Sequence, residues 1–153
     1  MLSNSTESCD NKVKTLSTRL KEREEKIQHV LECITEEAEK GTPIIVEGKK
    51  DVRTLAALGI KGNIISAKTG GKSRQDIILE LENICREDVV LLLDFDRRGR
   101  ELTEKLKQDL EKLGIRPNLV FWKELLGLMG RDVKDIEGIA GYLETLRRKI
   151  GEI

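Results

Sequence analysis

Two short apolar runs that end at acidic residues constrain the fold of this chain more than any other feature. Residues 43–46, with the sequence PIIV, lead directly into Glu47. Residues 89–93, with the sequence VVLLL, lead into Asp94 and Asp96. Short apolar runs of this kind predict strands that are buried on both faces, as in a parallel sheet. Open α/β sheets bind their ligands outside the carboxyl ends of the strands, so the acidic residues predict a site at that edge of the sheet.

Predicted strands alternate with predicted helices through the middle of the chain. The four predicted strands are residues 43–46, 63–66, 89–93 and 118–122. Apolar residues at helical spacing predict helices around residues 49–58, from Ser73 to Cys85, and after Gly99 with an end at Gly114. After the fourth strand we expect a short helix, a loop at residues 130–135 and a final helix. This alternation predicts an α/β fold with a parallel sheet flanked by helices.

A further helix is predicted before the sheet begins. Residues 12–40 contain no Gly or Pro, and their apolar residues fall near helical spacing, with Gly41 as the stop. We expect this amphipathic helix to pack on the domain, and an intermolecular coiled coil is the alternative. Residues 1–11 are rich in Ser and Asn, which is typical of a frayed terminus. The expected division is therefore a tail and helix at 1–41, then one domain with a helical tail at 42–153.

The charge balance argues against a protein that coats long stretches of nucleic acid. The sequence has 28 Lys and Arg residues and 28 Asp and Glu residues, so its formal net charge is zero. A protein that covers a long polyanion is expected to be more basic than this. Any contact with nucleic acid is therefore expected to be local, short or assisted by a metal.

The cysteines and the lengths of the apolar runs indicate the compartment. Cys9, Cys33 and Cys85 are scattered, without a CxxC pair, so they predict neither a zinc ribbon nor a disulfide framework. No apolar run reaches the roughly 18 residues needed to span a bilayer. Residues 1–11 also lack the apolar stretch of a signal peptide. We therefore expect a cytoplasmic protein with reduced cysteines and no contact with a membrane.

Carboxylates gathered at one edge of a sheet repel one another unless a positive charge lies between them. A divalent cation with oxygen ligands commonly fills that place, so Glu47, Asp94 and Asp96 are candidate metal ligands. Glu47 is also a candidate for proton transfer to or from an oxygen of a phosphate ester. Two alternatives stay open. In one, the two aspartates cap the following helix; in the other, Glu47 pairs with Lys49, Lys50 or an arginine.

Basic residues near the predicted site are candidates for binding phosphate. Lys49 lies two residues after Glu47, and Arg97 and Arg98 directly follow Asp96. The arginines have the alternative role of balancing nearby acidic charge. The loop KTGGK at residues 68–72 places a lysine on each side of two glycines, and Lys72 is its stronger candidate. A plain flexible loop is the alternative, because the Walker spacing is absent.

Four other features carry weaker signals. Arg100 is a further candidate to clamp a phosphate. The segment RDVKD at residues 131–135 follows the fourth predicted strand and has a lysine and an aspartate that are candidates for the same edge of the sheet. His29 lies in the predicted first helix without partners and is expected to be a surface or packing residue. Trp122 is expected in the core, with stacking on a base as the alternative.

Two motifs together resemble those of the Toprim domain. They are VEGKKD at residues 46–51 and LDFDRRG at residues 93–99, each at the end of a predicted strand. The resemblance covers the region from about Pro43 to Leu125, and it implies a compact Rossmann-like parallel sheet flanked by helices. The domain occurs in bacterial-type primases, type IA and type II topoisomerases, nucleases and recombination mediators.

The resemblance also implies roles for individual residues. Glu47 matches a glutamate that acts as general acid or base, and Asp94 and Asp96 match aspartates that coordinate Mg²⁺, with Mn²⁺ as an alternative. Asp51, like Gly48, lies in the first motif, where support of the loop is expected more than catalysis. Gly99, at the end of the second motif, is expected in a supporting role as well.

The chain departs from the larger members of that family. A topoisomerase needs a nucleophilic tyrosine in a further domain, and the single tyrosine here, Tyr142, lies in the predicted tail helix. A replicative primase carries extra domains that 153 residues do not accommodate. The chain is most similar to the small stand-alone Toprim proteins of archaea and bacteria. A nucleic-acid partner is expected, and a protein partner or homodimer through the first helix is a further option.

These observations favour Mg²⁺-dependent phosphodiester chemistry on nucleic acid, as a nuclease or by nucleotidyl transfer. One alternative is a Toprim module that binds a partner without catalysis, which the zero net charge favours. A second alternative is a phosphatase of the haloacid-dehalogenase type, because a D-x-D motif after an apolar strand also begins that fold. In that family the position of Arg98 is usually Thr or Val, which argues against it.

Overall fold

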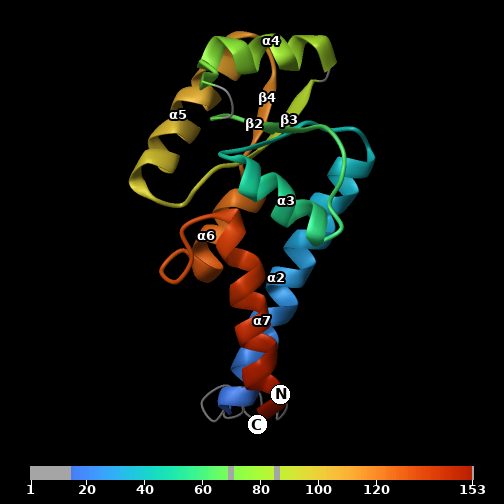
Figure 1. Ribbon diagram of the computed structural model, residues 1–153, viewed down its shortest axis with the longest axis vertical. Helices are drawn as coiled ribbons and strands as arrows, with labels where there is room; N and C mark the ends of the chain where they lie inside the picture. Colours follow the sequence, from blue (N-terminus) through green and yellow to red (C-terminus); the bar gives the residue numbers. More distant parts are fainter. Residues whose placement is uncertain (1–14, 69–70, 85–86, 153) are drawn as a thin grey trace, which may run out of the picture.

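A computed structural model describes three segments of the chain, residues 15–68, 71–84 and 87–152 (Figure 1). Several features singled out in the sequence lie outside them: the terminal residues 1–11, Thr69 and Gly70 of the KTGGK loop, and Cys85.

Four strands form one parallel sheet in the order β2-β1-β3-β4. The strands are β1 (Ile44–Val46), β2 (Ile64–Ser66), β3 (Asp88–Leu92) and β4 (Arg116–Asn118). The helices are α2 (Leu16–Glu39), α3 (Lys49–Ala57), α4 (Arg74–Ile84), α5 (Arg97–Lys112), α6 (Val120–Met129) and α7 (Ile136–Glu152). The predicted α/β fold, with a four-stranded parallel sheet and an added N-terminal helix, is confirmed.

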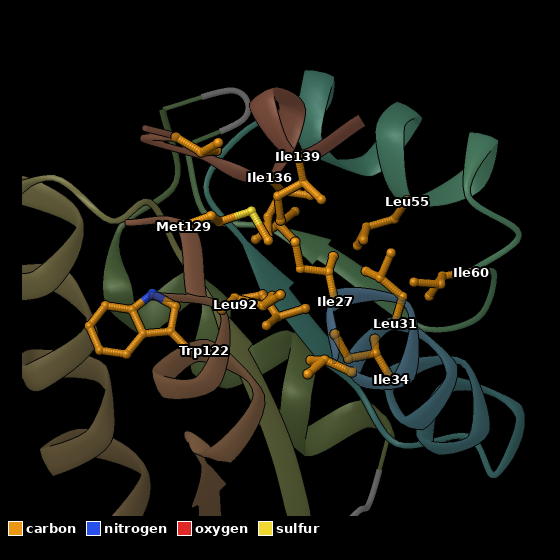
Figure 2. Packing of buried hydrophobic residues seen from close by; sticks show 14 of the residues in the cluster. Ile27, Leu31, Ile34, Leu55, Ile60, Leu92, Trp122, Met129, Ile136 and Ile139 are labelled. Atoms are coloured by element: carbon orange, nitrogen blue, oxygen red, sulfur yellow. The ribbon is translucent and has the colours of Figure 1, made fainter. Parts of the chain in front are cut away.

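Helices cover both faces of the sheet, and the alternation of residues along β3 shows how. Val90 and Leu92 belong to the core shared with α2, α3, α6 and α7. Val89 and Leu91 belong to the core shared with α4 and α5. Figure 2 shows the first core, in which Ile27 of α2 lies beside Leu92. A strand buried on both faces has no polar side, which explains why its sequence is apolar throughout.

The first helix packs mainly through its second half and pairs with the last helix. The buried residues of α2 run from Ile27 to Ala38. The start of α2 and the end of α7 lie together at the end of the molecule away from the sheet (Figure 1). There Arg147 Nε donates to Glu24 Oε1 at 3.0 Å and Arg147 Nη2 donates to Gln28 Oε1 at 3.0 Å. The N-terminal helix therefore shares one core with the C-terminal helix.

The prediction of a fourth strand at residues 118–122 is wrong in its position. The strand is Arg116–Asn118, and α6 begins at Val120. Asn118 Oδ1 accepts the N–H of Val120 at 2.9 Å and starts the turn into the helix. The buried residues of α6 are Trp122, Leu125 and Met129. This spacing is helical, so the apolar run after Asn118 forms the inner face of a helix rather than a strand.

Candidate metal centre

The sheet brings the two acidic segments together because β1 and β3 are neighbours in register. Val46, the last residue of β1, pairs with Leu92, the last residue of β3. Glu47 follows the first strand directly, and Asp94 and Asp96 follow the second. One oxygen from each of these three carboxylates lies within 4.8 Å of the others. The three acidic residues predicted from the sequence therefore form one cluster.

Glu47 is buried, with 4% of its surface exposed, and both of its oxygens have partners. Oε1 accepts the backbone N–H of Asp94 at 3.3 Å. Oε2 forms an ion pair with Lys68 Nζ at 2.8 Å, and this hydrogen bond raises the pKa of Lys68. The partner of Glu47 is therefore Lys68, which lies just past the end of β2, and not Lys49, Lys50 or an arginine as in the alternative.

Asp94 is the unsatisfied member of the cluster. Its Oδ1 is buried and has no hydrogen-bond partner among the described residues. Burial, followed by a side-chain hydrogen bond with Glu47 and by the negative charge of Glu47, raises the pKa of Asp94 to about 8. A buried oxygen without a partner is costly, and a cation beside it would remove that cost. The oxygen-only ligand set also suits a divalent cation such as Mg²⁺. The residues present therefore fit a divalent metal.

Asp96 is exposed, and besides belonging to the acidic cluster it caps the start of α5. Its Oδ1 accepts the N–H of Gly99 at 2.8 Å, so Asp96 is the N-cap of the helix. The alternative of a helix-capping aspartate therefore holds for one of its oxygens. Gly99 lies in the first turn of α5, not before the helix as expected. A Cβ on Gly99 would lie 2.0 Å from the backbone oxygen of Asp94, so only glycine lets the helix start this close to the cluster.

Phe95, between the two aspartates, fixes the turn that carries them. Its N–H donates to the backbone oxygen of Lys134 at 2.6 Å, and its carbonyl oxygen accepts from Arg100 Nε at 2.9 Å. Its ring lies 6.4 Å from that of Trp122, between centroids. Trp122 is buried and donates its indole N–H to the backbone oxygen of Leu93 at 2.8 Å. Trp122 is thus a core residue, as expected, and its position does not suit stacking on a base.

Asp51 holds the loop of the first motif. It is buried, and its Oδ2 accepts the N–H of Gly48 at 3.1 Å while its Oδ1 accepts the N–H of Glu137 at 3.1 Å. Burial raises the pKa of Asp51. These bonds join the start of α3 to the start of α7, and they place Gly48 and Asp51 in the support of the loop.

A cleft of about 300 Å³ opens beside the cluster. Its lining includes Glu47 and Asp94 of the cluster and the three lysines Lys49, Lys50 and Lys68. It also includes two acidic residues, Asp135 just before α7 and Glu137 in its first turn. Lys49 therefore lies where the sequence placed it. Asp135 also reaches this edge of the sheet, whereas Lys134 contributes its backbone oxygen to Phe95.

Several predicted phosphate-binding residues do not line this cleft. Lys72 pairs with Glu80 of α4 at 2.5 Å. Arg97 pairs with Glu101 at 3.1 Å, with 92% of the arginine side chain exposed, and Arg98 is exposed on the first turn of α5. His29 is exposed on α2, with its Nε2 3.7 Å from Cys33 Sγ.

Lys68 is the residue that sequence reasoning undervalued. In the sequence Lys68 is one flank of the glycine loop, in which Lys72 is the stronger candidate for binding phosphate. The available signal was its position two residues after Ser66, the end of β2. Because β2 pairs with β1, its carboxyl end lies at the same edge of the sheet as Glu47.

The sequence model of the Toprim-like family matches residues 44–136, which include every member of the acidic cluster. This chain belongs to the Toprim-like family. It is 36% identical to a UPF0292 protein of Methanosarcina barkeri over 133 residues, which are 86% of this chain and 90% of the relative. It is 38% identical to a UPF0292 protein of Methanocaldococcus jannaschii over 123 residues, 78% of this chain and 91% of the relative.

A solved structure of a protein from Aquifex aeolicus has the same fold, with a TM-score of 0.62 and 27% sequence identity. The similarity covers 72% of this chain and 94% of that chain. The predicted resemblance to small stand-alone Toprim proteins is thus confirmed. With the acidic cluster, membership in this family indicates a metal-binding function related to nucleic acid. The haloacid-dehalogenase alternative has no support in these matches. Among the described helices, none is both long and apolar enough to cross a membrane.

Proposed function

We propose that this Toprim-like protein carries out phosphodiester chemistry on nucleic acid, by strand cleavage or nucleotidyl transfer, with a divalent cation. The observation that supports this most directly is the acidic cluster, in which three carboxylate oxygens lie within 4.8 Å of one another and Asp94 Oδ1 has no partner among the described residues. Phosphoryl chemistry depends mainly on positioning and on stabilising negative charge, which such a centre provides.

Asp94 and Asp96 are the proposed ligands of Mg²⁺, and Mn²⁺ is an expected substitute. A bound divalent cation neutralises charge on the phosphate oxygens. Asp94 has to release its proton for this role, because its pKa is raised to about 8. Asp96 can cap α5 with one oxygen and keep the other for the cation.

Glu47 is the proposed proton carrier. Its Oε1 accepts the N–H of Asp94 and its Oε2 is held by Lys68, so the carboxylate has one fixed orientation toward the cleft. Lys68 is a positioning residue in this proposal, and its ammonium group also offsets part of the negative charge of the cluster. Lys49 lies in the same cleft and is the proposed contact for a phosphate of the substrate.

The test is an activity screen on labelled DNA and RNA with Mg²⁺ or Mn²⁺, run beside Glu47→Gln. This substitution keeps the shape of the side chain and removes its proton-carrying oxygen. We expect turnover to fall by about 100-fold or more, as for loss of a general acid or base, while Mg²⁺ binding changes little. The matched control is Glu144→Gln, on the exposed surface of α7. Turnover equal to that of the unmodified protein in Glu47→Gln would refute the assigned role.

A non-catalytic binding module is the second candidate, and the ion pair between Lys68 and Glu47 favours it. A lysine at 2.8 Å already supplies a positive charge to the cluster without any metal. The zero net charge agrees with a role in binding a protein partner. This candidate predicts no turnover on any labelled strand with either metal, and a Mg²⁺ affinity that Lys68→Met raises, because the competing ammonium group is gone.

A further inference from the structure

A second cavity, of about 410 Å³, lies where α2, α5 and the end of α6 meet. It shares no lining residue with the acidic cleft. Its lining consists of Arg23 from α2, Arg100 from α5 and the segment Leu126–Asp132. Small-molecule sites have volumes of roughly 300 to 1,000 Å³, so this cavity can hold a charged group of a ligand.

The cavity carries an excess of positive charge. Arg23, Arg100 and Arg131 line it, and Asp132 is the single carboxylate in its described lining. None of the three arginines forms an ion pair with a carboxylate in the described parts of the chain. Other arginines do: Arg116, for example, pairs with Asp88 at 2.8 Å. Cations that converge on one cavity without carboxylate partners attract an anion.

Neutral groups hold two of these arginines in place. One Nη of Arg23 donates to the hydroxyl of Tyr142 at 2.9 Å, and Arg100 Nε donates to the carbonyl oxygen of Phe95 at 2.9 Å. Each guanidinium keeps further N–H groups for a ligand, since arginine has five donors. Arg131, exposed on the loop after α6, can complete the set. The planar donor pair of a guanidinium matches two oxygens of a phosphate.

Arg100 also links this cavity to the metal centre. It binds Phe95, which lies between Asp94 and Asp96, and the N–H of Phe95 is bound by the loop that carries Arg131. In the turn at residues 94–96, the two aspartates therefore belong to the acidic cluster. The middle residue, Phe95, accepts a hydrogen bond from an arginine of the cavity. A strand with one phosphate at the carboxylates would have other phosphates available to these arginines.

We propose that the arginine cavity, defined by Arg23, Arg100 and Arg131, binds a phosphate group, and that this group is a phosphodiester of the nucleic-acid strand on which the acidic centre acts. The choice of a strand rests on the proposed function, whereas phosphate binding itself does not. The other source of the same chemistry is the phosphate of a free nucleotide.

The experiment measures binding by the full chain in EDTA, so that the metal centre does not contribute. The probes are a short single-stranded oligonucleotide without terminal phosphates, a nucleoside 5′-monophosphate and inorganic phosphate. The test variant is Arg131→Ala, because the exposed side chain has no described partner whose loss would disturb the fold. The matched control is Arg148→Ala on α7, which removes the same charge from a side chain that is 69% exposed and lines neither cavity.

We expect Arg131→Ala to weaken binding of the oligonucleotide on the order of tenfold, as for loss of one charge-assisted contact. The slope of log affinity against log salt should fall by roughly 0.7, the value for one phosphate contact on a single strand. Arg131→Lys should recover part of the affinity, and Arg148→Ala should match the unmodified protein. A loss confined to the mononucleotide and inorganic phosphate also supports a phosphate site, with a free nucleotide as its ligand.

Two results would overturn the proposal. One is that the unmodified protein binds none of the three probes, and the other is that Arg131→Ala and Arg148→Ala have the same affinities for all of them. Failure of the proposed function is a separate result. A protein without turnover in Mg²⁺ or Mn²⁺, yet with phosphate binding that depends on Arg131 in EDTA, would retain this site and lose the catalytic assignment.

Discussion

The acidic centre and the arginine cavity are joined through the turn at residues 94–96, yet their charges are paired in opposite ways. In the acidic centre, Glu47 is buried and paired with Lys68, while Asp94 has a buried oxygen with no described partner. In the arginine cavity, the cations Arg23 and Arg100 contact only neutral oxygens in the described structure. One site holds negative charge that lacks a cation, and the other holds positive charge that lacks an anion.

This difference in charge pairing predicts how stability and ligand binding respond to changes at each site. A buried carboxylate is costly, so the acidic centre gains stability when a cation arrives. An exposed arginine is well solvated and costs the fold little, so the cavity is available for ligand binding without a stability penalty. Changes in the acidic centre should therefore alter the fold and the chemistry together, whereas changes in the arginine cavity should alter binding alone.

The largest expected effect is that of Asp94→Asn on the acidic centre. The substitution removes a proposed ligand, so Mg²⁺ affinity should fall by more than the roughly 10- to 100-fold expected for loss of an outer-shell partner. Without metal the same variant should be more stable than the unmodified protein at neutral pH, by roughly 1 to 3 kcal/mol, since the folded state no longer has to keep a proton on a buried carboxyl. Titration calorimetry with Mg²⁺ and urea unfolding in EDTA measure the two quantities.

The corresponding change in the arginine cavity, Arg131→Ala, provides the comparison. It should leave both Mg²⁺ affinity and stability in EDTA unchanged, within about 0.5 kcal/mol. If Arg131→Ala lowered Mg²⁺ affinity as much as Asp94→Asn does, the two sites would not be separable and the contrast between them would be lost.

The largest loss of stability, as distinct from metal affinity, is expected for Gly99→Ala, which strains the turn between the two sites. The new Cβ would lie 2.0 Å from the backbone oxygen of Asp94, so α5 or the turn has to move. We expect a loss of about 3 kcal/mol or more in the free energy of unfolding, together with weaker Mg²⁺ binding. Gly141→Ala in α7 is the control, because its Cβ would meet nothing within 4 Å and should stabilise the helix by about 0.5 to 1 kcal/mol. Equal stability of the two variants in urea unfolding would contradict this account of Gly99.

The acidic centre was predictable from the sequence, whereas the arginine cavity was not. Glu47 and Asp94 follow apolar strands, and the geometry of a parallel sheet brings such residues together at one edge. In the sequence Arg100 is only a neighbour of the aspartates, and nothing around Arg23 in the first helix indicates a binding site. These two residues meet because α2 packs beside α6 and α5 follows β3, and such tertiary packing leaves no periodic signal in the sequence.

The position of the fourth strand shows the same limit within the fold. The run after Asn118 is apolar enough to form a strand. Only the later apolar residues Leu125 and Met129, which follow at helical spacing, indicate that the segment is a helix with one buried face. Short apolar runs do not distinguish the two structures by themselves. The existence of the strand was predicted correctly. Its position is explained by Pro117, which an edge strand tolerates, and by the turn at Asn118, which ends the strand.

The last expected effect is a pH dependence of stability, which separates the two sites without a drastic substitution. The pKa of Asp94 is raised from 3.8 to about 8 by burial and by Glu47. The protonated carboxyl is thus favoured in the folded state, and the stability it contributes is full below pH 3.8 and is lost as the pH rises through 8. In EDTA, urea unfolding should show stability falling between these limits as the pH rises.

Asp94→Asn should flatten this slope, because the groups that face Asp94, among them Asp51 and Asp135, then act on a neutral amide. Mg²⁺ affinity of the unmodified protein should rise over the same range, since the cation displaces the proton. Binding of the oligonucleotide in EDTA through Arg131 should stay constant, because guanidinium groups keep their charge throughout. A parallel pH dependence of metal binding and of oligonucleotide binding would mean that both depend on Asp94, and the phosphate would then belong to the acidic centre.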